Sequence, residues 1–248
     1  MAAIKLKEID THAPKQFEKS ETAEKLSKII ADLDELQNRL YAESNHSVLI
    51  VLQGMDASGK DRTIRRVFGQ LNPLGVSAFP FKAPEHSELA HDFLWRVHKL
   101  VPAKGMMVVF NRSHYEDVLV TRVHGWCNDE MARKRMKAIN EFENLLVEQN
   151  NTTILKFYLH VSHDEQLKRL NERIKDREKQ WKYNKEDFAE SSLWEKYREM
   201  YEDVFDHCSK IPWNIIPADQ KWYKDYLVAK TVRDALEKLD LQYPGLKK

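Results

Sequence analysis

The chain has 248 residues, of which 32% are charged and 42% hydrophobic, and its formal net charge is +1. This balance is typical of a globular protein, and so small a net charge excludes a general attraction to nucleic acid or to a membrane surface. No apolar run approaches the roughly 20 residues of a membrane-spanning helix. The two cysteines, Cys127 and Cys208, fit neither a disulfide framework nor a metal-binding spacing, which favours a reducing, cytoplasmic location.

The first part of the chain predicts an extended arm, a helix and a buried strand. Residues 1–19 are polar and mixed in charge, and apolar residues then recur at helical spacing up to about Tyr41. We expect this helix to pack against the rest of the protein or to contribute to an oligomer. The predicted division is therefore an N-terminal arm and helix over residues 1–45 and one main domain over residues 46–248.

The strand predicted at residues 48–52 leads into a glycine-rich turn. It breaks at Gly54, and Gly59-Lys60 begins a helix, which together match the phosphate-loop pattern G-x-x-x-x-G-K. In such a loop the backbone N–H groups and the helix dipole attract phosphate, and the lysine adds a mobile cation. The glycines could simply form a turn, but the lysine, strand and helix favour phosphate binding. The residues predicted to bind phosphate or nucleotide here are Gly54, Met55, Ala57, Ser58, Gly59, Lys60 and Asp61.

Two acidic residues distinguish this loop from an ordinary phosphate loop. Asp61 stands where a Ser or Thr usually follows the lysine, and Asp56 lies inside the loop. A carboxylate beside a polyphosphate repels it unless the carboxylate holds Mg²⁺, which bridges phosphate oxygens and neutralises their charge. We therefore predict that Mg²⁺ is the cofactor and that Asp56 binds it, with Asp61 and Asn111 as further candidate ligands.

Beyond the loop, apolar runs alternate with helical patterns to the end of the chain. This alternation predicts an α/β fold in which a parallel five-stranded sheet carries helices on both faces, and ligands bind such sheets at the carboxyl ends of the strands. Further strands are predicted at residues 76–81, 106–110, 153–161 and 213–216, and helices at about 59–71, 85–100, 128–150, 162–177, 187–209 and 222–239.

Polar side chains follow the second and third predicted strands. Asn111 occupies the position at which a nucleotide-binding protein usually carries a second magnesium acid, and its amide oxygen can coordinate a metal. Arg112 is placed to bridge phosphoryl oxygens, and Glu116 and Asp117 are the nearest carboxylates. These residues could simply cap a helix and form a surface salt bridge, but their place after a central strand favours catalysis. Lys82 follows the second strand and is expected in the same crevice.

A strongly basic segment follows the fourth predicted strand. Residues 168–185 contain eight Lys or Arg residues against three acids, and Arg169, Arg173 and Arg177 are spaced four apart, hence on one helical stripe. The usual explanation of such a run is a solvated helix face. At the mouth of a phosphate site, a row of arginines instead suggests a lid over a long polyanion.

Four separated motifs resemble the polyphosphate kinase 2 family, and the resemblance covers about residues 20–240. They are Gly54-Met-Asp-Ala-Ser-Gly-Lys-Asp, Phe81-Lys-Ala-Pro, Asn111-Arg-Ser-His-Tyr-Glu-Asp-Val-Leu-Val, and Arg169-Leu-x-x-Arg with Lys179-x-Trp-Lys. The resemblance implies a three-layer α/β/α P-loop kinase fold related to thymidylate kinases, with a helical lid at about residues 163–208. It also implies Mg²⁺-dependent phosphoryl transfer between inorganic polyphosphate and nucleotides, without a phosphoenzyme intermediate.

The resemblance assigns roles to individual residues. It implies that Asp56 holds magnesium, that Lys60 binds phosphate, and that Arg112 and the lid arginines clamp polyphosphate. The motif that begins at Asn111 resembles that of the subgroup that accepts both AMP and ADP. The expected partners are therefore polyphosphate, AMP, ADP and ATP, and the expected reaction is reversible. The protein is expected to be a homo-oligomer, either a dimer or a tetramer. The predicted catalytic residues are Asp56, Lys60, Asn111, Arg112, Glu116 and Asp117, the additional nucleotide-binding residues are Lys82 and Arg122, and the lid residues are Arg169, Arg173, Arg177, Lys179 and Lys182.

Two other functions are compatible with parts of this pattern. An ATP-dependent nucleoside or nucleotide kinase of the thymidylate kinase type would share the fold and the loop. A non-catalytic module that binds polyanions would share the basic segment, but it would leave Asp56 inside the loop unexplained. Within the family, an acid often stands at the position of Asn111, so the sequence does not identify the residue that binds the second metal ion.

Overall fold

The computed structural model describes residues 4–246 and has a five-stranded sheet in the order β2-β3-β1-β4-β5, in which every neighbouring pair is parallel. This arrangement confirms the predicted parallel α/β fold and all five predicted strands. The strands are β1 (Ser47–Gln53), β2 (Val76–Pro80), β3 (Met107–Asn111), β4 (Thr152–His160) and β5 (Trp213–Pro217).

The central strand positions the functional loops. All seven residues of β1 are buried, and its run of Val, Leu and Ile suits a strand covered by helices on both faces. Leu52 of β1 pairs with Asn111 of β3, and the N–H of Arg112 donates to the carbonyl of Leu52 at 3.0 Å. The loops that follow β1 and β3 therefore lie side by side, at the edge where parallel sheets bind ligands.

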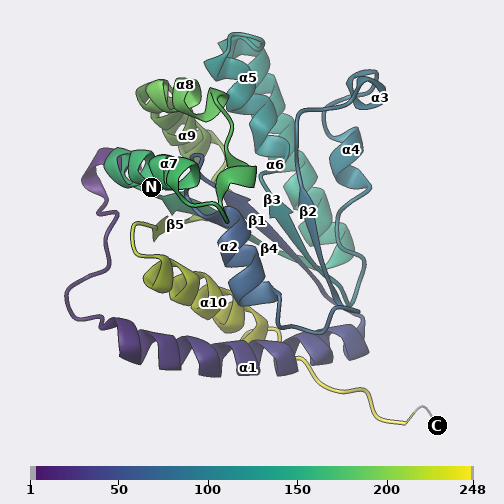
Figure 1. The fold of residues 1–248 in the computed structure, drawn as a ribbon. Coiled ribbons are helices and arrows are strands. Elements are labelled where there is room, and N and C mark those ends of the chain that lie inside the picture. Colours follow the sequence, from purple (N-terminus) through teal and green to yellow (C-terminus); the bar gives the residue numbers. More distant parts are fainter. Residues whose placement is uncertain (1–3, 247–248) are drawn as a thin grey trace.

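Helices cover both faces of the sheet (Figure 1). On one face α10 (Lys221–Glu237) packs against β4 and β5, and α1 (Lys19–Glu43) packs along α10. On the other face lies α6 (Asp129–Asn150), which begins where the Asn128 side chain accepts the N–H of Met131. The crossovers from β1 to β2 and from β3 to β4 run in opposite directions across the sheet, so right-handed connections place their helices on opposite faces.

The segment between β2 and β3 differs from the prediction. One helix was expected over residues 85–100, but the structure has two single turns, α3 (His86–Leu89) and α4 (Trp95–His98). Between them, Oδ1 of Asp92 accepts the N–H of Leu94 at 3.0 Å. Such a local turn offers the backbone an alternative to helical hydrogen bonds, which explains the interruption.

Several short elements complete the loops at the carboxyl edge. The helix after the phosphate loop begins as α2 (Lys60–Thr63) and continues as a π-helix, η2 (Ile64–Phe68). After β3 follow a short 3-10 helix, η3 (His114–Val118), and the single turn α5 (Val120–Val123). None of the helices within residues 4–246 is long and apolar enough to cross a membrane.

The segment predicted to be a lid lies between β4 and β5. The long helix expected over residues 187–209 is divided at Leu193, and the base of its second half enters the core through Tyr201, Val204 and Phe205. The lid helices lie together over one end of the sheet (Figure 1). They are α7 (His163–Lys175), η4 (Gln180–Lys182), α8 (Glu186–Ser192) and α9 (Trp194–His207).

The described part of the N-terminal arm, residues 4–18, is attached to the main domain. It contains one 3-10 turn, η1 (Leu6–Glu8), in which Leu6 is buried. The Leu6 N–H donates to the carboxylate of Glu202 at 2.9 Å, and its carbonyl oxygen lies 3.1 Å from Nε2 of His160. These contacts attach the arm to α9 and to the end of β4.

Candidate phosphate-binding site

The phosphate loop has backbone angles that few residues adopt. φ is 56° at Ala57 and 98° at Gly59, and both values lie in the left-handed region. Lys60 is buried, and its Nζ donates to the carbonyl oxygen of Gly54 at 2.7 Å and to that of Met55 at 3.2 Å. The lysine therefore reaches back across the loop and places its charge where the predicted phosphate would sit.

The loop also offers backbone donors. Within residues 4–246, the N–H groups of Gly59 and Lys60 meet no hydrogen-bond acceptor. These two N–H groups lie at the start of α2. The first N–H groups of a helix lack partners within the helix, and the helix dipole adds positive potential there. A phosphate oxygen would satisfy these groups, so the loop has the donors that an anion site needs.

Burial lowers the pKa of Lys60 to about 8, and the charge of Arg112 acts in the same direction. Asp56 and Glu116 oppose this shift because their negative charges favour the ammonium form. A bound phosphate would act in the same way as these carboxylates. The lysine is thus charged at neutral pH, and its charge becomes more stable when an anion binds.

Arg112 connects the two loops. Its φ of 60° is unusual for a residue other than glycine, and such backbone strain is concentrated at functional sites. Its Nη2 lies 2.5 Å from Oδ1 of Asp56, and its Nη1 lies 3.9 Å from Oε2 of Glu116. Burial opposes ionisation of Asp56, but the charges of Arg112 and Lys60 outweigh burial and lower the pKa of Asp56. The Arg112 side chain is 40% exposed, so an incoming phosphate can reach it.

Glu116 and Asp117 are adjacent in sequence but have different surroundings. Glu116 lines the cavity beside Arg112, and burial raises its pKa although the charge of Arg112 opposes the shift. Asp117 lies 3.7 Å from Arg96, and burial also raises its pKa. Because Arg96 donates to the backbone carbonyl of Lys82 at 2.9 Å, Asp117 is tied to the segment after β2. The exposed side chain of Lys82 belongs to that segment.

Asp61 joins three parts of the site. Its Oδ1 accepts a hydrogen bond from Nδ2 of Asn111 at 2.9 Å, and its Oδ2 lies 2.7 Å from Nζ of Lys182. Asn111 belongs to β3, and Lys182 belongs to η4 in the lid. The first turn after the phosphate loop therefore contacts both the neighbouring strand and the lid.

The donor set fits a magnesium ion that binds together with phosphate. Across residues 4–246, no group of three or more His, Cys, Asp and Glu side chains is arranged to hold a metal by itself. Mg²⁺ usually takes one or two carboxylates and completes its octahedral shell with water and substrate oxygens. Asp56 and Asp61 supply carboxylate oxygens beside the loop, and Asn111 adds a neutral amide.

Arg169 braces the phosphate loop from behind. A guanidinium has five N–H groups, and all five of Arg169 are engaged, while its side chain is only 7% exposed. One N–H donates to Glu165, and the other four donate to the backbone carbonyls of Ala57, Ser58, Ala218 and Asp219. The structure thus places this predicted lid residue under the loop.

The other basic lid residues are more accessible. Arg173 forms an ion pair of 2.6 Å with Asp187, and its charge helps to lower the pKa of Asp56. Arg177 is exposed and lies beyond the last residue of α7, so the expected arginine stripe is only partly helical. Lys179 pairs with Glu172 and Asp176, at 3.3 and 3.0 Å.

Arg122 lies outside the group of residues that surrounds the loop. Its side chain is 8% exposed and forms ion pairs of 2.7 Å with Asp129 and 2.6 Å with Asp203. These pairs join α5 to α6 and to α9. In the described part of the chain, Arg122 is not among the residues that line the cavity beside the loop.

That cavity has an aromatic wall that was missed in the sequence. Trp194, Tyr197 and Tyr201 of α9 recur at helical spacing, but the same spacing also fits a stripe that faces the core. Gln166 and Glu190 belong to no motif, so no sequence signal identified them. The cavity is lined by Gly54, Met55, Asp56, Arg112, Glu116, Val120, Gln166, Glu190, Trp194, Tyr197 and Tyr201.

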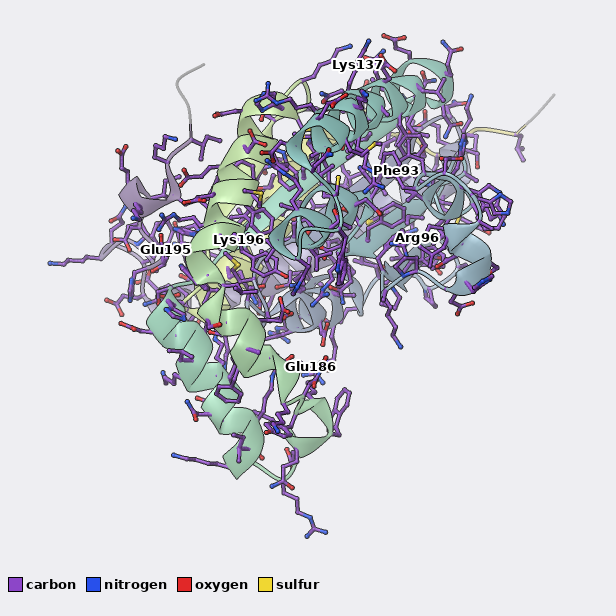
Figure 2. The ribbon with its side chains drawn as sticks, turned by 90° about the horizontal axis from the view of Figure 1, so that it is seen from above. Phe93, Arg96, Lys137, Glu186, Glu195 and Lys196 are labelled. Atoms are coloured by element: carbon purple, nitrogen blue, oxygen red, sulfur yellow. The ribbon has the colours of Figure 1, made fainter. Side chains whose placement is uncertain are left out.

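The site lies between two flanks of the molecule. Seen from above in Figure 2, Glu195 and Lys196 of α9 and Glu186 of α8 lie on one flank. Phe93 and Arg96, from the segment between β2 and β3, lie on the other. The lid and the segment after β2 can therefore approach a bound chain from opposite sides.

Buried hydrogen bonds fix α9 against both functional loops. The Tyr201 hydroxyl accepts the Gly54 N–H at 3.3 Å and donates to Oε1 of Gln53 at 3.2 Å. Nε2 of Gln53 donates to the Ser113 hydroxyl at 3.0 Å. A further bond of 3.1 Å runs from Gln166 to the backbone carbonyl of Asp56. Gln53, Gln166 and Tyr201 hold the loop without belonging to any predicted motif.

A second buried network supports the loop after β3. The carboxylate of Glu143 accepts from the Tyr115 hydroxyl at 2.7 Å and lies 2.8 Å from Nζ of Lys156. Burial opposes ionisation of Glu143, but its hydrogen bond with His114 and the charge of Lys156 outweigh burial and lower its pKa. The network anchors His114 and Tyr115 in the interior, while Arg112 and Glu116 line the cavity.

The parallel sheet, the phosphate loop after its central strand and the basic lid define a protein of the P-loop kinase class. A profile of the polyphosphate kinase 2 (PPK2) family matches residues 16–244, and the chain therefore belongs to this family.

Individual relatives cover most of the chain. The chain is 47% identical to an AMP/ADP-polyphosphate phosphotransferase of Meiothermus ruber over 97% of this chain and 91% of that protein. It is 40% identical to an ADP-polyphosphate phosphotransferase of Rhodopseudomonas palustris over 86% of this chain and 78% of that protein. The crystal structure of polyphosphate kinase 2 from Arthrobacter aurescens matches with a TM-score of 0.97 at 41% identity, covering 100% of this chain and 90% of that one.

Proposed function

We propose that this protein transfers phosphoryl groups from inorganic polyphosphate to AMP and ADP, giving ADP and ATP, and that the reaction is reversible. The observation that carries the proposal is the near full-length similarity to the Meiothermus ruber protein, whose name states both nucleotides. The phosphate loop and basic lid suit a donor that is anionic at every unit. A single phosphate loop serves both steps, so both acceptors use one site.

The chain's own residues divide the work of binding and orientation. Lys60 and the free N–H groups of the loop hold the terminal phosphoryl group of the donor. Arg112 exchanges its contact with Asp56 for contacts to the phosphoryl oxygens, and Arg173 of the lid binds further along the chain. Phosphoryl transfer depends on positioning and charge stabilisation more than on covalent chemistry by the protein, and these lysine and arginine side chains can supply both.

Magnesium is part of the proposal. Asp56 would hold the ion, with Asp61 and Asn111 as further candidate ligands. When bound, Mg²⁺ would bridge phosphate oxygens and neutralise the charge that develops on them. The acceptor nucleotide would lie toward Glu116, Lys82 and the segment after β2. The cytoplasmic location and homo-oligomeric state expected from the sequence belong to the same proposal.

The test is an incubation of the purified protein with AMP, Mg²⁺ and polyphosphate, with nucleotides resolved by chromatography over time. We expect ADP to appear first and ATP to follow. A parallel reaction contains ATP in place of polyphosphate, and another starts from ADP and polyphosphate. Omission of Mg²⁺ with a chelator present should abolish product formation.

The outcomes separate the alternatives. ADP without ATP, even at long times and high polyphosphate, would leave an enzyme of narrower acceptor range. Transfer from ATP but not from polyphosphate would favour the ATP-dependent kinase, and polyphosphate binding without any product would favour the non-catalytic module.

A further inference from the structure

A second lysine lies behind the phosphate loop and has no part in the chemistry described above. Lys224 belongs to α10, and its side chain is 0% exposed. Its Nζ donates to the backbone carbonyl of Gly59 at 2.9 Å and to that of Ser58 at 3.4 Å. Of the described residues, these two carbonyls are its hydrogen-bond acceptors. A buried ammonium is costly to desolvate unless it is well partnered, so this contact is an unusual feature.

The acidic neighbour of Lys224 does not explain its position. Asp225 lies 3.7 Å away, too far for a hydrogen bond, and it has other partners. Thr63 donates to Oδ1 of Asp225 at 3.0 Å, and Nε of Arg62 lies 3.3 Å from its Oδ2. The lysine therefore directs its hydrogen bonds at the loop, while its neighbour contacts α2.

The lysine also explains a glycine in the loop. A Cβ at Gly59 would collide with Nζ of Lys224, and the φ of Gly59 is 98°. The backbone angle favours a residue without a side chain, and any side chain at this position would force the ammonium of Lys224 to move. Gly59 and Lys224 thus form one unit, although they are far apart in sequence.

The geometry of the peptide bond links these carbonyls to the phosphate side of the loop. In a trans peptide the C=O and the N–H of the same unit point in opposite directions. Lys224 holds the carbonyls of Ser58 and Gly59, and those units carry the N–H groups of Gly59 and Lys60. These are the two N–H groups that lack acceptors. Arg169 holds the carbonyls of Ala57 and Ser58 in the same way.

We propose that Lys224 is a positioning residue of the phosphate site: it fixes the carbonyls of Ser58 and Gly59 from behind so that the N–H groups of Gly59 and Lys60 face the donor phosphate. It acts through the loop and does not touch the substrate. In its ammonium form Lys224 also places positive charge behind the loop, which favours an anion in front of it. Burial lowers the pKa of Lys224 to about 7, and the negative charge of Asp225 opposes this shift.

The test compares three variants of the full chain. Lys224→Met removes the donor and keeps the length of the side chain, and Lys224→Gln keeps an N–H donor without the charge. Lys230→Met is the matched control, because Lys230 lies on the same helix, is 44% exposed and pairs only with Asp234 among the described residues. Calorimetry measures binding of inorganic tripolyphosphate without nucleotide. Thermal melting confirms that each variant is folded.

We expect Lys224→Met to bind tripolyphosphate about tenfold more weakly than the wild type, the loss expected when hydrogen bonds to a charged group are no longer oriented. Lys224→Gln should recover part of the loss, and Lys230→Met should stay within about twofold of the wild type. The polyphosphate KM should rise in Lys224→Met while the nucleotide KM changes little. A merely structural role would lower the melting temperature without this split.

Two results would overturn the inference. One is wild-type tripolyphosphate affinity in Lys224→Met, and the other is a Lys224→Gln variant that binds no better than Lys224→Met. If Lys224→Met does not fold, Lys224→Gln is compared with the wild type alone, and equal affinity rejects the role. The kinetic readout rests on the proposed function, but the binding readout does not. A wild-type protein that binds tripolyphosphate and yields no nucleotide product would reject the proposed function alone.

Discussion

Lys182 of the lid lies 2.7 Å from Asp61, which follows the last residue of the phosphate-loop motif. The two residues are separated by 121 positions, and their contact closes the lid against the first turn of α2. Both side chains are partly exposed, at 33% and 61%. An exposed pair of this kind contributes about 0–1 kcal/mol, so it can hold the lid closed and still release it readily.

We expect Asp61→Asn to loosen the lid in the absence of ligands. The variant leaves the lid sequence unchanged, so chymotrypsin meets the same exposed sites at Trp181 and Tyr183. Cleavage there should accelerate, and raised salt should accelerate cleavage of the wild type in the same way because salt screens exposed charges. Asp32→Asn, which alters a remote exposed ion pair, is the control. Equal cleavage rates for Asp61→Asn and the wild type would show that this contact does not restrain the lid.

Replacing Asp56 by Asn should remove most of the activity while the fold remains. Asp56 is the carboxylate inside the loop and the partner of Arg112, so the variant loses both the proposed metal ligand and the ion pair. A loss on the order of 10²-fold or more in kcat is expected when charge stabilisation of this kind is removed. A Mg²⁺ titration of the rate measures it, with Glu130→Gln on the exposed face of α6 as control. Near-normal turnover at ordinary Mg²⁺ would contradict the metal assignment.

Replacing Arg173 and replacing Arg169 should have different effects on substrate KM and on stability. Arg173→Ala should raise the KM for polyphosphate more than that for nucleotide, and the difference should shrink as salt rises because the interaction is electrostatic. Arg169→Ala should impair both substrates and lower the melting temperature, because its five N–H groups hold backbone carbonyls and Glu165. Steady-state kinetics of both variants, measured at low and at high salt, distinguish these two effects. Identical profiles for the two variants would reject this division of roles.

The buried Glu143 should make stability depend on pH. Its pKa in the folded protein is lowered, so its stabilising contribution is complete above the unfolded pKa and is lost as the pH falls through the folded pKa. Glu143→Gln leaves Lys156 without its buried partner and should cost about 3 kcal/mol of unfolding free energy at pH 7.

Urea unfolding at pH 7 and in acid measures this dependence. The difference between Glu143→Gln and the wild type should narrow in acid, where Glu143 becomes protonated in both folded and unfolded chains. Glu141→Gln, exposed on the same helix, should behave like the wild type at both pH values. A difference that stays constant across this pH range would rule out the proposed linkage.

The sequence by itself determined the fold class and the chemistry of the main loop. Strand and helix periods are local properties, so the five strands and the long helices could be predicted from apolar spacing. The phosphate loop could be identified because its glycines, lysine and flanking elements are contiguous. The turn around Asp92 and the break at Leu193 were missed. The first depends on a side-chain hydrogen bond that competes with helical ones, and at the second the Leu193 N–H donates to the carbonyl of Glu190, three residues back.

Only the tertiary structure decided which charges face a substrate and which hold the protein together. Arg169 and Arg173 are both arginines on the predicted helical stripe. The N–H groups of Arg169 nevertheless donate mainly to backbone carbonyls, whereas the side chain of Arg173 stays partly exposed. Lys224 carries no motif at all, because its partners are backbone carbonyls, which every residue possesses. A sequence lists donors, whereas the acceptor that each donor meets depends on chain segments brought together from more than a hundred residues away.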